Sequence, residues 1–231
     1  MATLDPAIGY DWQNWSMIKS IFDGLMDYVP GTTTLRAGLA ESYEISPDGL
    51  TYTFKLRPSV KFHNGREMTA EDVKYSLDRV TDPATQSPGA GFFGSIAGFE
   101  AAGPDGLSGV EVVDPLTVKI TLKEPSALLP FYLAEGTASI QSAASAPNNR
   151  TTPVGTGPYR FVKWVRGDSI EMERYADYKG PVAPRIQHAL FRFMPDENAQ
   201  VLALRSGQVD YLPYIAAVEA INNLAKDGQF K

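Results

Sequence analysis

The chain has 231 residues, of which 43% are hydrophobic and 21% are charged, a composition typical of a globular protein with room for one or two domains. Its formal net charge of −6, without a cluster of Lys and Arg, argues against a nucleic-acid-binding surface. The absence of cysteine excludes disulfides, thiolate nucleophiles and cysteine-ligated zinc sites.

The first half of the chain contains three segments with clear periodicity. Residues 16–26 carry apolar side chains at helical spacing, and Ser16 is a candidate for the N-cap of this predicted helix. Residues 51–57 alternate strictly between apolar and polar side chains, which predicts a half-buried strand. Thr69 opens a variant capping box that precedes apolar residues at helical spacing, so a second helix of about ten residues is predicted there.

The middle of the chain alternates between irregular and strand-like segments. Residues 83–109 are rich in Gly, Pro, Ala and Ser and predict an irregular excursion. Residues 118–122 alternate as a strand does, and the small-residue segment 141–155 is a candidate crossing between structural units. Residues 158–175 predict a β-hairpin that turns at 166–168.

The last third of the chain is expected to contain two strands and a helix. Residues 190–193 and 209–212 have strand-like patterns. Residues 196–206 predict a helix that begins at an Asp cap and ends at Gly207. Strands, hairpins and helices in this order do not follow a strict βαβ alternation, so the expected fold class is α+β.

One segment has more aromatic residues than local structure requires. Residues 9–15 place Tyr10, Trp12 and Trp15 among polar residues that include Asp11, just before the predicted helix. Large rings with polar tips are suited to lining a ligand cleft. The alternative is that the tryptophans fill the core beneath this loop, and the composition of the segment does not separate the two interpretations.

Residues suited to catalysis or metal binding are few. The chain has two histidines, His63 and His188, which lie far apart in sequence, whereas a metal site needs about three converging ligands. The acidic pair Glu71 and Asp72 falls in the first turn of a predicted helix, where carboxylates favour the helix dipole. The Arg-Gly-Asp sequence at 166–168 is explained by a polar hairpin turn. We therefore expect no catalytic residue, no metal site and no cofactor.

Several blocks of the sequence together resemble one protein family. Residues 39–79 (LAESYEISPDGLTYTFKLRPSVKFHNGREMTAEDVKYSLDR) are similar to the signature region of bacterial solute-binding proteins of the dipeptide/oligopeptide/nickel family. Further blocks of the same family, in the same order, are TLDP at 3–6, IFDGL at 21–25, PVGTGPY at 153–159 and ALRSGQVD at 203–210. The resemblance covers nearly the whole chain.

The resemblance implies an architecture of two lobes around a cleft that closes on its ligand by a hinge motion. It implies a periplasmic-binding-protein-like fold of type II, present here in part. Residues 1–37 and 151–231 are expected to form a discontinuous and incomplete first lobe, and residues 38–150 an inserted α+β subdomain. Full members of the family are longer, so the second lobe is expected to be absent from this chain and ligand binding by these residues alone to be greatly weakened.

The function implied by the resemblance is capture of a solute outside the cytoplasmic membrane and delivery to the permease and ATPase subunits of an ABC importer. The expected ligand is a peptide or a similar small solute, and the full-length protein is expected to be a monomer that binds no nucleic acid. It would lie in the periplasm or be held at the cell surface as a lipoprotein, although no leader sequence is visible here. The alternatives are a module for an oligosaccharide or a metal complex, a ligand-sensing signalling module and, least favoured, a hydrolase.

The resemblance also bears on the aromatic segment. In family members the loop before the first helix contributes to the ligand site, and Tyr10, Asp11 and Trp12 occupy that position. The resemblance therefore implies that Tyr10 and Trp12 stack on the ligand and that Asp11 receives an amino or hydroxyl group. Trp15 is included among the candidate ligand-binding residues, although it lies closer to the helix and is also a candidate for the core.

Overall fold

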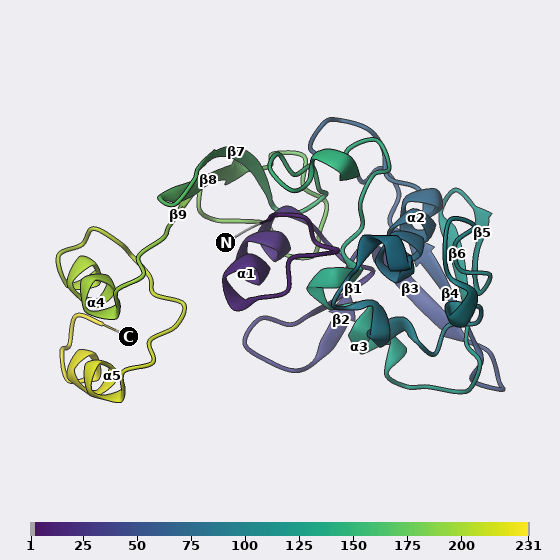
Figure 1. Ribbon diagram of the computed structural model, residues 1–231, viewed down its shortest axis with the longest axis horizontal. Helices are drawn as coiled ribbons and strands as arrows, with labels where there is room; N and C mark the ends of the chain where they lie inside the picture. The colour runs from purple at the N-terminus through teal and green to yellow at the C-terminus, as the bar shows by residue number, and fades with distance from the viewer. Residues whose placement is uncertain (1–2, 231) are drawn as a thin grey trace. The chain divides into compact units, whose positions relative to one another are not determined.

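The structure is a computed structural model that describes residues 3–230 and, for Trp12 and Gln13, the backbone alone. The chain forms two compact units, shown in Figure 1. The first unit comprises Met1–Trp164 and Glu171–Ala189, and the second comprises Val165–Ile170 and Leu190–Lys231. The lobe and subdomain boundaries expected at 37/38 and 150/151 remain a prediction.

The core of the first unit is built on a four-stranded antiparallel sheet in the order β3-β4-β6-β5. These strands are β3 (Ala40–Ile45), β4 (Thr51–Leu56), β5 (Val110–Asp114) and β6 (Thr117–Thr121). The alternation in β4 buries Tyr52, Phe54 and Leu56 on one face, as a strand with one solvated face requires. The strands predicted at 51–57 and 118–122 are thus confirmed.

Helix α2 (Ala70–Thr81) packs against β5 and β6. Its start is fixed by Asp72, whose carboxylate accepts a hydrogen bond from the Thr69 N–H at 2.9 Å, as in a capping box. Its apolar stripe, Val73, Leu77 and Val80, is buried. The predicted helix is therefore confirmed, and the hydrophobic stripe supplies the reason for its position on the sheet.

The first helix begins earlier than its sequence pattern predicts. Helix α1 spans Trp12–Ile21, whereas the prediction was 16–26 with Ser16 as the cap. Asp11 is the N-cap, since its carboxylate accepts a hydrogen bond from the Asn14 N–H at 2.9 Å. Phe22 is extended and ends the helix, and the chain then leads into the short pair β1 (Met26–Tyr28) and β2 (Leu35–Ala37).

The connection predicted to be irregular contains three short 3-10 helices, η1 (Pro83–Thr85), η2 (Ala90–Phe93) and η3 (Phe99–Ala101). After the sheet, the chain forms α3 (Leu129–Tyr132), η4 (Gly136–Ala138) and η5 (Ala146–Asn148). Phe93 and Ile96, both buried, anchor the irregular connection in the core. Apolar anchors of this kind explain how a Gly- and Pro-rich segment holds a defined path.

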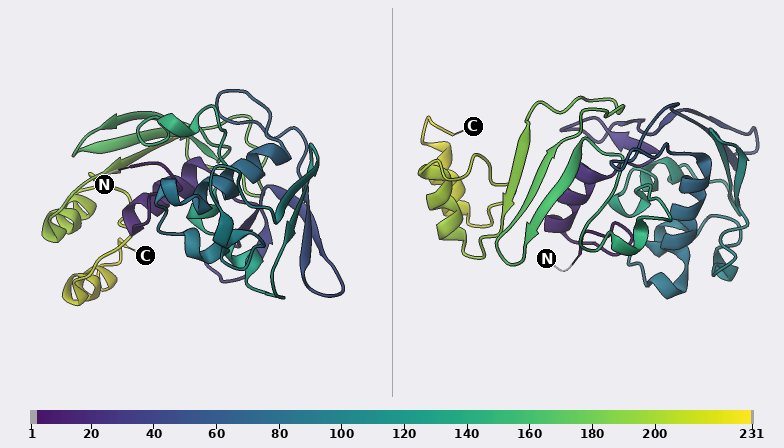
Figure 2. Two further views of the ribbon diagram at one scale, coloured as in Figure 1. Left: turned by 45° about the vertical axis from the view of Figure 1, so that its right-hand side comes forward. Right: turned by 90° about the horizontal axis from the view of Figure 1, so that it is seen from above.

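A three-stranded sheet, β7-β8-β9, follows (Figure 2). Its strands are β7 (Tyr159–Val165), β8 (Ser169–Arg174) and β9 (His188–Arg192). The first two form the predicted hairpin, and Gly167 occupies the left-handed region at the turn, with φ 77°. Ile170 and Met172 of β8 are buried. The strand predicted at 190–193 is confirmed as β9, which begins two residues earlier.

The helices of the second unit are α4 (Glu197–Arg205) and α5 (Val218–Ala225). Asp196 caps α4 by accepting a hydrogen bond from the Ala199 N–H, and Gly207 follows its end with φ 71°, both as predicted. The strand predicted at 209–212 is wrong: in the described part of the chain these residues form no strand. A strand needs a hydrogen-bonded neighbour, and no described strand pairs with this segment.

Candidate ligand-binding surface

Tyr10 presents its ring at the surface, immediately before α1. Its side chain is 43% exposed, and its ring meets the Trp15 ring edge-on, with centroids 5.2 Å apart. The Phe92 ring lies 6.2 Å from the Tyr10 ring, with the two planes inclined by 38°. These contacts fix the orientation of the Tyr10 ring, and its exposed part is open to another planar or apolar group.

Trp15 lies within α1 and is half-buried. Its indole packs over Gly136, where a Cβ atom would lie 3.5 Å from Trp15 Nε1. The indole N–H is enclosed and has no hydrogen-bond partner among the described residues. Trp15 therefore combines a packing role with an unused donor, and its predicted ligand role stays a prediction.

Asp11 is exposed and acts first as the cap of α1. Its two carboxylate oxygens accept from the backbone N–H and the side-chain Nδ2 of Asn14, at 2.9 and 2.7 Å. These bonds orient the carboxylate without covering it, so a ligand role stays a prediction. The side chain of Trp12 lies outside the described residues, and its predicted role stays a prediction as well.

Two aromatic residues that the sequence did not suggest extend this surface. Phe92 stacks on Tyr132 of α3, with centroids 5.3 Å apart and planes inclined by 20°. Together with Trp15 and Tyr10 they form a continuous line of rings, which we call the aromatic row: Trp15, Tyr10, Phe92 and Tyr132. Phe92 sits in the irregular connection, where no periodic pattern could have indicated it.

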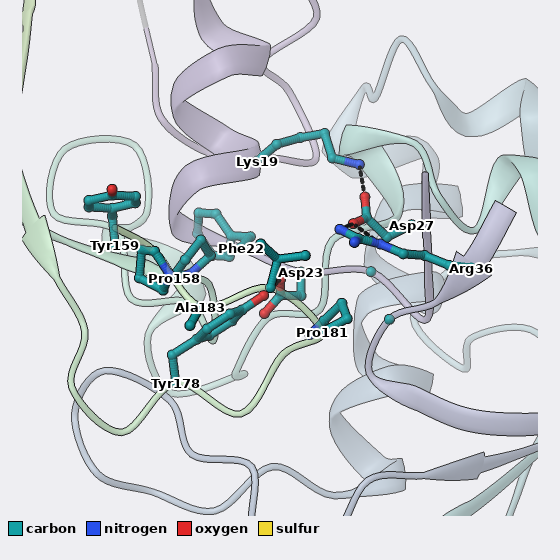
Figure 3. Close-up of a pocket in the computed structure, with 14 residues that line it drawn as sticks. Lys19, Phe22, Asp23, Asp27, Arg36, Pro158, Tyr159, Tyr178, Pro181 and Ala183 are labelled. Atoms are coloured by element: carbon teal, nitrogen blue, oxygen red, sulfur yellow. Dashed lines mark hydrogen bonds and ion pairs between the residues drawn. The ribbon is translucent and has the colours of Figure 1, made fainter. Parts of the chain in front are cut away.

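A pocket of about 260 Å³ lies at the other end of α1 (Figure 3). At one side Asp27 binds Arg36 Nη2 at 2.5 Å and Lys19 Nζ at 3.2 Å. Burial acts to raise the pKa of Asp27, but the Arg36 hydrogen bonds and the Lys19 charge outweigh it and lower that pKa. The remaining wall consists of apolar and aromatic groups from residues 158–159 and 178–184.

Asp23 lies in the same pocket and accepts two hydrogen bonds, from Tyr178 OH at 3.3 Å and from Thr156 Oγ1 at 3.1 Å. Burial raises the pKa of Asp23 to about 6, against the effect of these bonds. Burial, and after it the Asp23 charge, also raises the pKa of Tyr178. Because Asp27 pairs with Arg36 and Lys19, and Asp23 accepts from two hydroxyl groups, we assign these charged groups a structural role.

The two histidines have separate surroundings. His63 is enclosed: its Nε2 lies 2.9 Å from Gly157 O, its Nδ1 accepts from the Gly155 N–H at 3.3 Å, and Tyr175 meets its ring edge-on at 4.8 Å. His188 is exposed at the start of β9. Within residues 3–230 no group of three or more His, Cys, Asp or Glu side chains is placed to hold a metal ion. His63 is thus held by hydrogen bonds to the backbone of Gly155 and Gly157.

The sequence pattern described as "Bacterial extracellular solute-binding proteins, family 5 Middle" matches residues 34–230. The chain belongs to this family. The resemblance that the signature blocks indicated is thereby confirmed, and the match includes the four-stranded sheet and the aromatic residue Phe92.

Curated members of family 5 are similar over most of the chain. The glutathione-binding protein GsiB of Escherichia coli O1:K1 / APEC is 36% identical over 219 residues, covering 92% of this chain and 40% of that protein. GsiB of Shigella boydii serotype 4 is 35% identical over the same share of both proteins. The chain thus spans about two fifths of the length of these family 5 relatives.

Solved structures of family 5 proteins have the same fold. AgaA of A. tumefaciens R10, in complex with agropinic acid, is 36% identical, with a TM-score of 0.80 over 90% of this chain and 40% of that chain. DppA of Helicobacter pylori, in complex with the peptide STSA, is 30% identical, with a TM-score of 0.82 over 97% and 46% of the two chains. The expected α+β fold of the type II periplasmic-binding-protein kind, present in part, is confirmed.

One further observation concerns the membrane. In the described part of this family 5 chain, no helix has both the length and the apolar character that spanning a bilayer requires.

Proposed function

We propose that this chain is part of an extracytoplasmic solute-binding protein that captures a peptide or a similar small solute for an ABC importer. The observation that carries the proposal is the family 5 match over residues 34–230. The solute would pass to a membrane permease driven by ATPase subunits. The full-length protein would act in the periplasm or, in a lipoprotein form, at the outer face of the membrane.

The aromatic row is the proposed contact surface for the ligand. Tyr10 offers an exposed ring face held by two aromatic neighbours, so a ligand group can stack there with little loss of side-chain entropy. The enclosed N–H of Trp15 would be satisfied by a ligand or water oxygen. The Asp11 carboxylate is suited to an amino or hydroxyl group, and Trp12 is proposed to stack beside it.

The ligand class is inferred from the chemistry of this surface and from what related proteins bind. Rings beside a carboxylate fit a ligand that has apolar or planar groups and a positively charged or hydrogen-bonding end. The named ligands of relatives, glutathione, the peptide STSA and agropinic acid, are small, polar and flexible. A peptide or peptide-like solute is therefore favoured, with an oligosaccharide or a metal complex as alternatives; NikZ of Campylobacter jejuni carries Ni(L-His).

Binding without chemical conversion is the proposed activity, since solute-binding proteins release the molecule that they capture. A ligand-sensing role, in which the bound protein signals to a receptor, uses the same surface and is the second candidate. A hydrolase is the least favoured. Turnover of a bound peptide that is lost on replacing His63 or His188 would replace the binding proposal with an enzymatic one.

The proposal is tested with the full-length protein by identifying the co-purified ligand by mass spectrometry and titrating that ligand by calorimetry. Tyr10→Ala is expected to weaken binding by about twofold to tenfold, because a stacking ring contributes roughly 0.5–1.5 kcal/mol. Tyr43→Ala is the matched control, since this tyrosine is similarly exposed, at 37%, but lies on β3 outside the aromatic row. Equal affinity for Tyr10→Ala and the unchanged protein would remove Tyr10 from the site.

A further inference from the structure

Residues Gly155–Gly157, which we call the joint, lie against the end of α1 with no space to spare. The Gly157 N–H donates to Ile21 O at 2.8 Å. A Cβ atom on Gly155 would lie 2.1 Å from Ile21 O, and one on Gly157 would lie 2.5 Å from the Ile21 carbonyl carbon. Glycine is required at both positions by this close approach of two backbones. The joint therefore has one tightly defined position.

His63 holds the joint from one side through both ring nitrogens. Nε2 lies 2.9 Å from Gly157 O and donates to it, while Nδ1 accepts from the Gly155 N–H at 3.3 Å. The backbone N–H of His63 also donates to Gly155 O at 2.8 Å. Only a neutral imidazole with its proton on Nε2 satisfies this pattern, because a proton on Nδ1 would face the amide hydrogen of Gly155.

The surroundings of His63 also favour its neutral form. Burial lowers the pKa of His63 to about 4, and the charge of Arg160 acts in the same direction. Arg160 is itself paired with Glu173 at 2.7 Å, and the Tyr175 ring meets the imidazole edge-on. A positive charge on His63 would thus be both poorly solvated and placed opposite a hydrogen-bond donor.

Asp23 holds the joint from the other side. Its Oδ2 accepts from Thr156 Oγ1 at 3.1 Å. Its Oδ1 accepts from Tyr178 OH at 3.3 Å, and Figure 3 shows Asp23 and Tyr178. The charged groups that face it are Asp27 and Lys19. Protonating this carboxylate leaves one acceptor oxygen and adds a donor, and both hydroxyl partners can also accept. The contact of Asp23 with Thr156 therefore survives protonation, unlike that of His63 with Gly155.

We propose that the joint responds to acid on one side only. Protonation of His63 breaks its hydrogen bond with the Gly155 N–H, while the contact between Asp23 and Thr156 stays formed. The two sides differ because imidazole loses its acceptor when it binds a proton, whereas a carboxyl group keeps one. Through mildly acidic conditions both sides remain bonded. Once the pH is low enough to protonate His63, the Gly155 N–H loses its acceptor, whereas the Gly157 N–H still donates to Ile21 O.

The first test follows His63 in the unchanged chain by NMR, and the chain's histidine content makes this direct. The sequence has two histidines, and His188→Gln assigns the two ring signals. We expect His63 to be the neutral Nε2–H tautomer and to stay neutral until the pH approaches its burial-lowered pKa of about 4. Titration of His63 near its ordinary pKa of 6.5, or the Nδ1–H tautomer, would overturn the proposal.

The second test measures hydrogen exchange at the two glycine amides as protection factors, corrected for intrinsic pH dependence. As His63 becomes protonated, the protection of Gly155 is expected to fall about tenfold, the loss of one hydrogen bond, while that of Gly157 is retained. An equal loss of protection at Gly155 and Gly157 indicates global unfolding and contradicts a response confined to the His63 side. Unchanged protection at Gly155 while His63 titrates contradicts it equally.

Variants assign each side of the joint. His63→Gln keeps a side-chain donor but lacks the Nδ1 acceptor, so Gly155 protection should be low at every pH. Asp23→Asn removes the titrating carboxylate and should leave the acid response of Gly155 as it was. Loss of that response in Asp23→Asn would show that Asp23, not His63, controls the joint.

Discussion

Helix α2 in the first unit and α5 in the second are both amphipathic, yet they differ in how far their apolar faces are buried. α2 leaves Val73 and Leu77 only 0% and 1% exposed. α5 leaves Val218 and Ile221 68% and 44% exposed and buries Leu224. The same kind of sequence pattern thus forms a helix in both places, but burial requires a complementary surface that the pattern does not encode.

The helices of the second unit depend more on polar contacts. The Glu197 carboxylate of α4 accepts hydrogen bonds from the Ala216 and Ala217 N–H groups at the start of α5, the latter at 2.9 Å. Such a cap contributes about 1 kcal/mol, less than the burial of one large apolar side chain. We therefore expect the second unit to open locally at a lower free energy than the first.

The largest effect is expected from Phe54→Ala in the sheet core, where the ring is 0% exposed. Removing it should lower the free energy of unfolding by about 3–5 kcal/mol through lost burial and a cavity. Leu202→Ala in α4, 68% exposed, is the comparison and should change it by less than about 0.5 kcal/mol. Urea denaturation measures the free energy of unfolding of both variants. Equal losses would contradict the expected difference in burial between α4 and the sheet core.

Asp5→Ala is expected to lower the free energy of unfolding by about 3 kcal/mol, because it breaks a buried ion pair. Asp5 is 1% exposed, and Arg79 Nη1 and Nη2 bind its two oxygens at 2.8 and 2.6 Å. The single variant leaves the partly buried Arg79 without its carboxylate partner, whereas Asp5→Ala combined with Arg79→Met should recover part of the loss. If the double variant is less stable than the single variant by a further 3 kcal/mol, the charges are not coupled.

The pH dependence of the first unit is expected to combine two opposing contributions. Burial raises the pKa of Asp23 from 3.8 to about 6. The contribution of Asp23 to the free energy of unfolding therefore falls as the pH rises between these two values, by about 3 kcal/mol at most. Because burial lowers the pKa of His63 from 6.5 to about 4, stability from that group falls as pH drops through nearly the same window.

Asp23→Asn separates the two contributions. The unchanged protein should show little net dependence between about pH 4 and 6, while the variant should become steadily more stable as pH rises, from His63 alone. Denaturant titrations at several pH values measure this slope. Parallel pH curves for the variant and the unchanged protein would mean that Asp23 titrates near its ordinary pKa.

The smallest effect is expected for Glu197→Ala in the second unit. Loss of the cap should speed hydrogen exchange in α5 about fivefold, corresponding to about 1 kcal/mol, with α2 unaffected. Exchange followed by mass spectrometry resolves the two helices. An equal increase of hydrogen exchange in α2 would show that the two units unfold together. It would contradict the expectation that the second unit opens locally at a lower free energy.

Elements with strong local signals could be predicted from the sequence. The alternation of 51–57, the Thr69–Asp72 capping box, the hairpin turn at Gly167 and the stop at Gly207 each encode their structure within a few residues. The start of α1 was misplaced because Asp11 caps it ahead of the apolar stripe. The strand predicted at 209–212 failed because strand formation depends on a partner distant in sequence.

The sequence by itself determined the family, the α+β class and the presence of ring side chains around Tyr10. Tertiary structure alone decided which groups meet: Phe92 beside Tyr10, Arg79 on Asp5, and His63 on the joint. The physical reason is range. Caps and periodicity act over one or two turns of chain, whereas these contacts join residues 74 and 94 positions apart, as for Arg79–Asp5 and His63–Gly157, and form only when the core brings them together.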